Sequence, residues 1–227
     1  MIQTRSTESC SGNCPLCGNP RKSVFALPHT VVWQCTAPDC GLQFADPQPS
    51  GKELERAYTD LYYPAEGTRE VRFENTPDDT FRQAFWKIQA RFGDLKGLRL
   101  LDYGCGRGAL MRVSLEFGLR PSGIESDPLA RAATAGVPGT ETYASLTELQ
   151  SADPDGRFDL IILWTVIEHL RKPWLDLAQL RTFLRPGGWL LIFTMDIHCL
   201  RARLERKKWE SYENRTHLYY LDRKSVV

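Results

Sequence analysis

The segment from Leu98 to Pro128 constrains the fold more than any other part of the chain. A mainly apolar run ends at Asp102 and leads into a turn. An acidic residue, Glu125, lies about 20 positions after this turn. The turn holds alternating glycines at Gly104, Gly106 and Gly108. A strand, a glycine turn, a helix and a second strand in this order are typical of a nucleotide-binding βαβ unit. The segment therefore predicts a parallel strand pair with a ligand at its turn.

Strand and helix patterns alternate from this segment to the end of the chain. Predicted strands cover residues 98–102, 121–125, 140–143, 158–164 and 189–194. The strongest of them, Phe158 to Trp164, is almost continuously apolar. Apolar strands separated by helices are typical of a parallel sheet that is covered on both faces. We therefore predict an α/β fold with a Rossmann-like, doubly wound sheet.

Five of the seven cysteines lie in the first 40 residues. Four of them form two closely spaced pairs, each followed by glycine, and these residues are Cys14, Cys17, Cys35 and Cys40. Short spacing lets two sulfurs converge from one loop, so this pattern predicts a zinc-ribbon module with a structural Zn²⁺ on four thiolates. Cys10 is a spare thiol that could replace one of the four. An activating role for the zinc is the alternative, but four thiolates leave no open position on the metal.

The bulk properties of the chain argue against some partners. Its 227 residues carry a formal net charge of +1, which does not favour nucleic acid or an anionic membrane. No apolar run is long enough for a membrane span, and Met1 to Asn13 has no signal-peptide core. We therefore expect a cytoplasmic protein, with no membrane partner. The basic cluster between Arg201 and Lys208 is expected to be a solvated helix face, with nucleic acid binding as the alternative.

The glycine turn suits two classes of cofactor. The spacing of Gly104, Gly106 and Ala109 fits a nicotinamide or flavin dinucleotide. Asp102, however, would lie close to the pyrophosphate of such a cofactor and repel it. S-adenosylmethionine has no phosphate and carries an ammonium and a sulfonium group, so an acid at the strand end suits it. Glu125 can accept hydrogen bonds from ribose hydroxyls in either case. An NAD-dependent oxidoreductase remains the less favoured interpretation.

Four segments together resemble the successive motifs of class I S-adenosylmethionine-dependent methyltransferases. They are residues 101–108, 123–128, 158–170 and 184–194. The N-terminal cysteines, with residues 209–220, resemble a subgroup that carries a zinc module ahead of this domain. The resemblance implies a methyltransferase with bound S-adenosylmethionine. It also implies a division into a disordered tail (1–12), a zinc ribbon (13–46), linker and lid helices (47–95) and a cofactor-binding methyltransferase domain (96–227).

The same resemblance assigns residues to the cofactor. Those that would line its methionine part are Asp102, Gly104, Cys105 and Gly106. Glu125 would hold the ribose and Ser126 would lie against the adenine. Ser145 stands where the family often has an adenine-reading Asp. Trp164 at a strand end and Tyr63 in a lid complete the predicted cofactor-binding set.

Three residues are candidate catalytic bases. His169 follows the strand that ends at Trp164, in a segment that resembles ubiquinone-type O-methyltransferases, some of which hold a divalent ion there. Thr165 replaces the first acid of that metal site, so we predict no metal there. His217 lies in an aromatic-rich segment after the last predicted strand, and Asp196 lies at the end of that strand. Each of these residues could instead have a structural role.

The preferred function is transfer of a methyl group to a small-molecule hydroxyl. The alternatives are C- or N-methylation of a small metabolite, or a non-catalytic protein that binds zinc and the cofactor. In the family the sheet usually continues beyond a segment like residues 217–220, and here only seven residues follow Tyr220. We therefore expect either a shortened chain or a homodimer or partner subunit that covers the exposed sheet edge.

Overall fold

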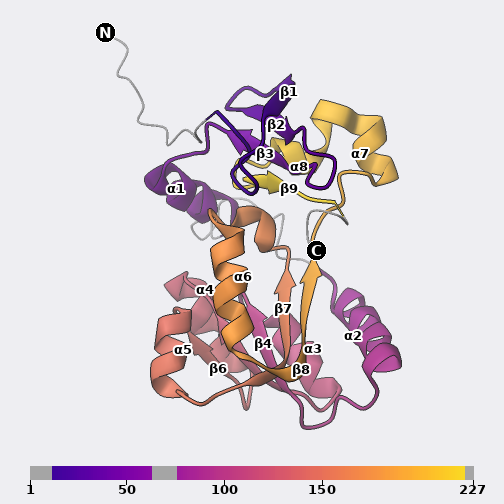
Figure 1. Ribbon diagram of the computed structural model, residues 1–227. Helices are drawn as coiled ribbons and strands as arrows, with labels where there is room; N and C mark the ends of the chain where they lie inside the picture. Colours follow the sequence, from indigo (N-terminus) through magenta and orange to yellow (C-terminus); the bar gives the residue numbers. More distant parts are fainter. Residues whose placement is uncertain (1–11, 63–75, 223–227) are drawn as a thin grey trace. The chain divides into compact units, whose positions relative to one another are not determined.

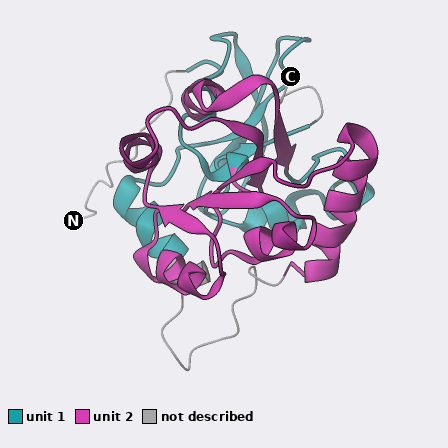
Figure 2. Ribbon diagram, turned by 90° about the horizontal axis from the view of Figure 1, so that it is seen from below, with its two compact units in different colours: residues 1–60, 167–174, 194–227 teal, residues 61–166, 175–193 magenta. Residues whose placement is uncertain are grey.

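A computed structural model describes residues 12–62 and 76–222, except for the side chains of residues 59–62. Tyr63 and Cys10 lie outside the described residues. The chain divides into two compact units, coloured separately in Figure 2. The first, which we call the cysteine unit, combines residues 1–60, 167–174 and 194–227. The second, the parallel-sheet unit, combines residues 61–166 and 175–193.

The parallel-sheet unit contains a five-stranded sheet, which is drawn in Figure 1. They are β4 (Arg99–Tyr103), β5 (Arg120–Ile124), β6 (Glu141–Tyr143), β7 (Phe158–Trp164) and β8 (Leu184–Phe193). They are parallel throughout and lie in the order β6-β5-β4-β7-β8. This order confirms the predicted Rossmann-like fold. Among the described residues the sheet ends at β8 on one side and at β6 on the other.

Helices cover the sheet, and α2 shows how an apolar face packs on it. They are α2 (Asp78–Phe92), α3 (Ala109–Glu116), α4 (Pro128–Ala133), η1 (Thr134–Gly136), α5 (Leu146–Ala152) and α6 (Pro173–Thr182). In α2, Phe81, Phe85 and Ile88 recur at helical spacing and are all buried. They pack with Leu100 and Leu160 of the sheet into the main apolar core. Continuous burial of apolar side chains is thus what holds this unit together.

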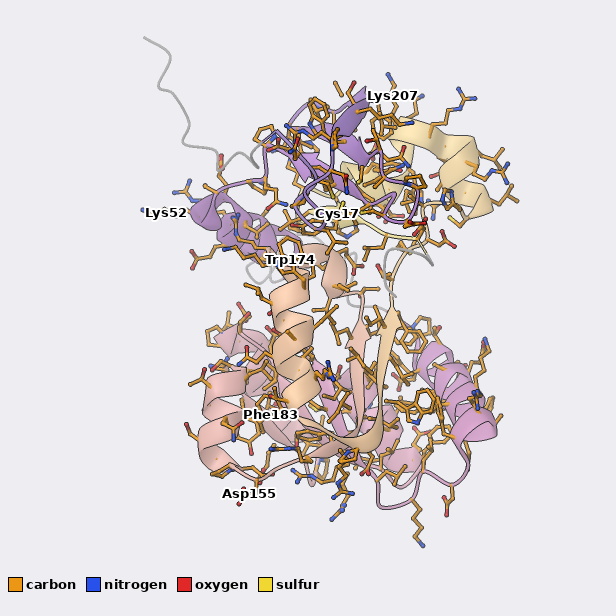
Figure 3. All side chains as sticks on the ribbon, in the orientation of Figure 1. Cys17, Lys52, Asp155, Trp174, Phe183 and Lys207 are labelled. Atoms are coloured by element: carbon orange, nitrogen blue, oxygen red, sulfur yellow. The ribbon has the colours of Figure 1, made fainter. Side chains whose placement is uncertain are left out.

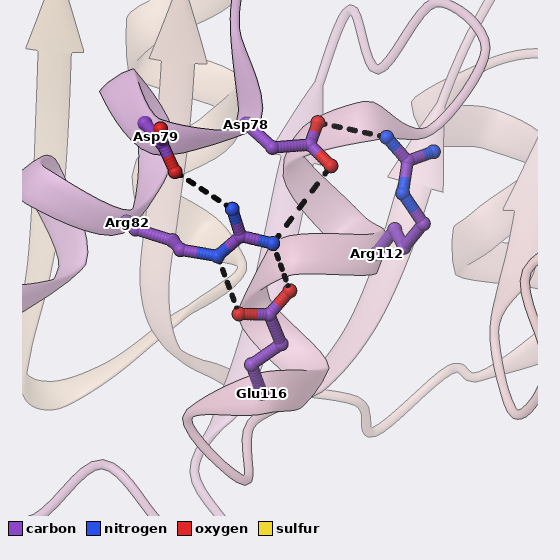
Figure 4. Close-up of polar contacts among 5 residues, drawn as sticks. All are labelled: Asp78, Asp79, Arg82, Arg112 and Glu116. Atoms are coloured by element: carbon purple, nitrogen blue, oxygen red, sulfur yellow. Dashed lines mark hydrogen bonds and ion pairs between the residues drawn. The ribbon is translucent and has the colours of Figure 1, made fainter.

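Exposed ion pairs also connect α2 with α3 (Figure 4). Arg82 donates two hydrogen bonds of 2.7 Å to the carboxylate of Glu116, and Arg112 reaches back to Asp78 at 2.8 Å. Asp79 completes the network through Arg82. Charges this exposed are screened by water and salt, so the network adds little to the apolar core beneath it.

The cysteine unit has a small antiparallel sheet whose strands come from both ends of the sequence. Its strands are β1 (Arg21–Ala26), β2 (Val31–Cys35), β3 (Gln43–Asp46) and β9 (Tyr219–Tyr220), in the order β1-β2-β3-β9. The last strand comes from the far end of the sequence and pairs Tyr219 with Phe44 and Tyr220 with Gln43. We predicted only an aromatic-rich segment here, because two residues are too few to show the alternation of a strand.

Short helices and an aromatic core complete the cysteine unit. The helices are α1 (Gly51–Tyr62), η2 (Ile167–His169), α7 (Leu200–Glu205), η3 (Arg206–Lys208) and α8 (Glu210–Glu213). Trp209, Tyr212 and Tyr220 are buried together with Val32 of the N-terminal sheet. Residues from the C-terminal part of the chain thus form the core of a module that begins with the cysteines.

Candidate cofactor-binding and proton-accepting sites

The glycine turn after β4 has a backbone that only glycine adopts readily. Gly104, Gly106 and Gly108 have φ values of 81°, 52° and 82°. At Gly104 a Cβ atom would lie 2.5 Å from Cγ2 of Val166, which is too close for any side chain. At Gly106 a Cβ would meet nothing within 4 Å. The turn therefore packs tightly on one side and leaves open space at Gly106.

Glu125 follows β5 and faces this turn. Its Oε2 accepts a hydrogen bond of 3.0 Å from the Gly106 amide, and its Oε1 accepts one of 2.7 Å from the Asp127 amide. Burial raises the pKa of Glu125, and these two amide hydrogen bonds oppose the rise. Each oxygen keeps a further lone pair. The carboxylate is thus fixed in place and can still accept hydrogen bonds from a ligand with neighbouring hydroxyls.

Asp102 is a buried acid at the end of β4, only 2% exposed. Its Oδ2 has no hydrogen-bond partner among the described residues. Burial, and then the charge of Glu125, raise the pKa of Asp102 to about 8. An unpaired buried carboxylate is costly, so a cationic or hydrogen-bond-donating ligand group would relieve the cost. The donor set of Asp102 and Glu125 fits a ligand with an ammonium group and a ribose. It fits a pyrophosphate poorly.

The other predicted cofactor residues have varied surroundings. The Cys105 thiol is buried, and its Sγ lies 2.5 Å from where a Cβ on Gly123 would be, so it packs against that glycine. Ser126 is exposed. The Ser145 hydroxyl caps α5 by accepting a hydrogen bond from the Glu148 amide. Their roles toward a cofactor stay predictions.

Trp164 lies at the end of β7, where it makes aromatic contacts. Its ring stacks on Phe193 at 4.3 Å between centroids and meets Phe81 edge-on at 4.9 Å. The next residue, Thr165, has a φ of 51°, which is unusual for a β-branched residue. Its amide donates to the Phe193 carbonyl at 2.7 Å, which holds this conformation. Strain of this kind concentrates at functional sites, and the sequence showed no sign of it.

The four predicted metal ligands of the cysteine unit come together. The sulfurs of Cys14, Cys17, Cys35 and Cys40 all lie within 4.8 Å of one another. Two of the distances, Cys14 to Cys40 and Cys17 to Cys35, are 3.8 and 3.4 Å. Tetrahedral thiolates around Zn²⁺ would be ~3.8 Å apart. All four cysteines are free thiols rather than disulfides, so the arrangement suits a four-coordinate metal ion.

Donors lie beside two of the four sulfurs, whereas burial raises the pKa of Cys14 and of Cys40. The Asn19 side chain lies 3.4 Å from the Cys17 sulfur, and the Ala37 amide lies 3.4 Å from the Cys35 sulfur. Burial raises the pKa of Cys17, but hydrogen bonds from Asn19 outweigh it and lower the pKa to about 6. Outer donors of this kind orient metal ligands and stabilise their charge.

Hydrogen bonds in the cysteine unit fix the proton on His217. Asn214 Oδ1 accepts from the Thr216 amide at 3.0 Å and from its hydroxyl at 2.7 Å, so the Asn214 Nδ2 must face the histidine. That Nδ2 lies 3.1 Å from Nε2 of His217, which must therefore accept. Nδ1 then carries the proton and donates to the Ser211 carbonyl at 2.8 Å. Both nitrogens of His217 are engaged, and burial lowers its pKa to about 3.

His169 is held in the same neutral tautomer by a different acceptor. Its Nδ1 lies 3.0 Å from the Thr216 carbonyl, which can only accept, so Nδ1 carries the proton and Nε2 carries the lone pair. Burial lowers its pKa to about 4, which keeps the ring neutral. The two histidine rings meet edge-on at 4.7 Å between centroids. The neutral ring of His169 thus carries its lone pair at Nε2, whereas Nε2 of His217 accepts a hydrogen bond from Asn214.

Glu168 is a functional candidate that we did not predict. It is 3% exposed, and neither carboxylate oxygen has a hydrogen-bond partner of good geometry among the described residues. Burial raises its pKa to about 7, although the nearby Thr194 hydroxyl favours the charged form. One of its oxygens lies within 4.8 Å of a ring nitrogen of each histidine. The signal in the sequence was the pair Glu168-His169 itself, but its burial was not readable.

Asp196 has a local structural contact. Its Oδ1 accepts a hydrogen bond of 2.8 Å from the His198 amide, and its backbone bridges to Leu221. This contact stabilises the turn that leads into α7. A role for Asp196 as a base stays a prediction.

Comparisons with known proteins identify the family. A family model described as a methyltransferase domain matches residues 35–226. Two curated relatives are ubiquinone biosynthesis O-methyltransferases. The relative from Bradyrhizobium sp. (strain ORS 278) is 32% identical, and the match covers 45% of this chain and 42% of the relative. The relative from Nitrobacter winogradskyi is 34% identical, and the match covers 45% of this chain and 40% of the relative. The chain thus spans less than half the length of these relatives.

Solved structures similar to this chain are also methyltransferases. The plantazolicin methyltransferase BpumL, in complex with a pentazolic desmethylPZN analog and SAH, is similar with a TM-score of 0.50 and 15% identity, over 73% of this chain and 63% of its own. A SAM-dependent methyltransferase from Archaeoglobus fulgidus has a TM-score of 0.49 and 18% identity, over 64% and 65%. The family match, together with the sheet order and the glycine turn, shows that this chain belongs to the methyltransferase-domain family and has the class I, Rossmann-like fold.

Proposed function

We propose that the protein transfers a methyl group from S-adenosylmethionine to a hydroxyl group of a small molecule. The observation that carries the cofactor assignment is Asp102, a buried acid without a partner for Oδ2 at the end of β4. Family membership supports the reaction. The choice of a hydroxyl acceptor rests on the two curated relatives, which are named as O-methyltransferases.

Two acids would hold the cofactor. Ionised Asp102 would pair with the ammonium group of its methionine part, which removes the cost of the buried charge. Glu125, fixed by the amides of Gly106 and Asp127, would accept hydrogen bonds from the ribose hydroxyls. When bound, S-adenosylmethionine supplies an electrophilic methyl group on its sulfonium. The chain's remaining tasks are to align the acceptor and to take up its proton.

We assign the proton to His169 rather than to His217. The Thr216 carbonyl holds the Nδ1 proton of His169, which leaves Nε2 to accept one. The carboxylate of Glu168 would stabilise the imidazolium that forms, since opposite charges at this range attract strongly in a buried site. His217 acts as a fixed, neutral neighbour in this scheme.

We further propose that the four cysteines hold a structural Zn²⁺. Four thiolate ligands leave no position for a substrate or water, so the ion would stabilise the fold of the cysteine unit without taking part in the reaction. A second copy of the chain is proposed to cover the outer edge of β8, which has no strand partner among the described residues. Light scattering coupled to gel filtration would show a dimer, and a monomer would contradict this.

Transfer of an isotopically labelled methyl group tests the function. Purified protein is incubated with labelled S-adenosylmethionine and with phenols, amines and activated carbon acids. Labelled methyl ethers are expected from the phenols, and His169→Gln should lower the rate by about 10²–10⁴-fold. His217→Gln, the matched control, should have a smaller effect. Label in amines or at carbon would overturn the O-methyl assignment, and label nowhere despite cofactor binding would favour a binding protein.

A further inference from the structure

Helix α7 presents its two leucines to solvent. Leu200 and Leu204 are 71% and 74% exposed, whereas Ala202 is only 5% exposed and packs into the aromatic core. An α-helix turns by about 100° per residue, so the leucines lie about 40° apart on one face and Ala202 lies opposite them. The small residue anchors this helix, and two large apolar side chains point outward. Large exposed apolar residues grouped on one face mark interaction surfaces.

Basic side chains surround these leucines. Arg201 and Arg203 flank them on either side of the helix, and Arg206, Lys207 and Lys208 follow in η3. Figure 3 shows Lys207 projecting away from the ribbon. Arg201 is paired with Glu205 at 2.8 Å and lies 3.4 Å from Glu210. Within the described part of the chain, the other four cations have no ion pair.

The charge of this segment departs from that of the chain. Residues 199–209 contain five basic residues and one acidic residue, whereas the whole chain has a net charge of +1. The positive charge is thus concentrated at the exposed leucines. Arginine and lysine also have long apolar stems, which let the charge lie at a different depth from the rest of the side chain.

We propose that α7 and η3 form a binding surface for anionic lipid bilayers. The two leucines would enter the boundary between headgroups and acyl chains, and the basic groups would contact lipid phosphates. None of the described helices is long and apolar enough to cross a membrane, so the association would be interfacial. The proposal replaces the expectation of no membrane partner, which rested on net charge and on the lack of a spanning segment.

The pattern favours a bilayer over nucleic acid. Nucleic acid binding needs cations and commonly uses aromatic side chains that stack on bases. The aromatic residue that follows η3, Trp209, is fully buried, and the leucines would keep a phosphate backbone at a distance. A bilayer would contact the basic side chains and the leucines at the same time. The proposal does not depend on the methyl acceptor or on catalysis.

Vesicle co-sedimentation of the full chain tests this surface. The probes are vesicles of phosphatidylcholine alone and of phosphatidylcholine mixed equally with phosphatidylglycerol, at low and at high salt. We expect binding to the mixed vesicles only, with strong weakening by salt. Lys207→Ala with Lys208→Ala should weaken binding about 25-fold, which is about fivefold per charge. Leu200→Ser with Leu204→Ser should weaken it at least tenfold.

Matched controls separate this surface from general effects. Leu175→Ser removes another exposed leucine, at 56% exposure, and Lys52→Ala with Lys87→Ala removes two other lysines. These variants should bind vesicles like the wild type. S-adenosylmethionine binding by every variant, measured by calorimetry, checks the fold and tests the proposed function separately. Equal binding to neutral vesicles, no binding to either kind, or equal losses in the controls would overturn the proposal. Salt-sensitive binding to an oligonucleotide without vesicle binding would assign the surface to nucleic acid.

Discussion

The two units of the molecule are stabilised in different ways. The parallel-sheet unit has a continuous apolar core in which Leu100 and Leu160 of the sheet meet Phe81 and Phe85 of α2. The cysteine unit is drawn from three stretches of the chain and relies on four converging sulfurs, a hydrogen-bond network and a cluster of aromatic rings. Local pattern is therefore enough to specify the first unit, whereas the second depends on contacts between residues that are far apart in sequence.

Removal of the proposed Zn²⁺ should reveal the largest difference between the two units. A structural Zn²⁺ contributes about 10–16 kcal/mol to the folding of small modules, so its loss should unfold the N-terminal sheet. After treatment with a chelator, or in Cys17→Ser with Cys35→Ser, amides of β2 and β3 should lose protection from hydrogen exchange by at least about 100-fold. Amides of β4 and β7 should keep theirs. Unchanged protection of β2 and β3 would show that the cysteines hold no structural metal.

Within the parallel-sheet unit, replacement of Glu125 should weaken ligand binding. Glu125→Ala removes the acceptor of the Gly106 and Asp127 amides and of the proposed ribose hydroxyls. Hydrogen bonds to a charged group are worth about 1.5–3 kcal/mol each, so the affinity for S-adenosylmethionine should fall at least about tenfold. Calorimetry measures this. The exposed Glu141→Ala serves as a control, and an unchanged affinity in Glu125→Ala would contradict the assignment.

Gly104→Ala should destabilise the parallel-sheet unit through its backbone. The φ of 81° and the 2.5 Å approach to Val166 leave no room for a methyl group. The expected loss is about 1–3 kcal/mol in the free energy of unfolding, measured in urea. Adding Val166→Ala should recover part of it by removing the contact but not the backbone strain. A stable Gly104→Ala variant would show that the turn is looser than the structure indicates.

The smallest effect is expected from the exposed ion pairs between α2 and α3. Arg82→Met should lower the melting temperature slightly at low salt and not at all at high salt, because water and ions screen such charges. Thermal unfolding at two ionic strengths measures this. A large loss that persists at high salt would mean that polar contacts, and not only apolar burial, stabilise the parallel-sheet unit.

The same contrast explains what could be predicted from the sequence. Apolar runs such as Phe158–Trp164 and the glycine turn after Asp102 are local signals, so the order of strands and helices and the position of the turn followed from them. The cysteine spacing is also local, and the four sulfurs do converge. The pairing of β9 with β3 joins residues that lie at opposite ends of the chain, and no periodicity records it.

The candidate site was less predictable than the fold. The state of His217 depends on Asn214, Thr216 and Ser211, which are ordinary polar residues in the sequence. Their hydrogen bonds are the reason why we propose His169, and not His217, as the base. The burial of Glu168 depends on how the chain packs around it. The exposed leucines of α7 were likewise hidden, because a helical pattern does not say which face is covered.

The pH dependence of cofactor affinity is the sharpest test of the role of Asp102. Burial raises the pKa of Asp102 to about 8, and the proposed ammonium group binds only the ionised form. Below that pKa, binding must release a proton, so the affinity for S-adenosylmethionine should rise by up to about tenfold per pH unit between pH 6 and pH 8. Asp102→Asn should bind weakly with no such slope, and NAD should not bind. A flat profile with unchanged affinity in Asp102→Asn, or tighter binding of NAD, would contradict the cofactor assignment.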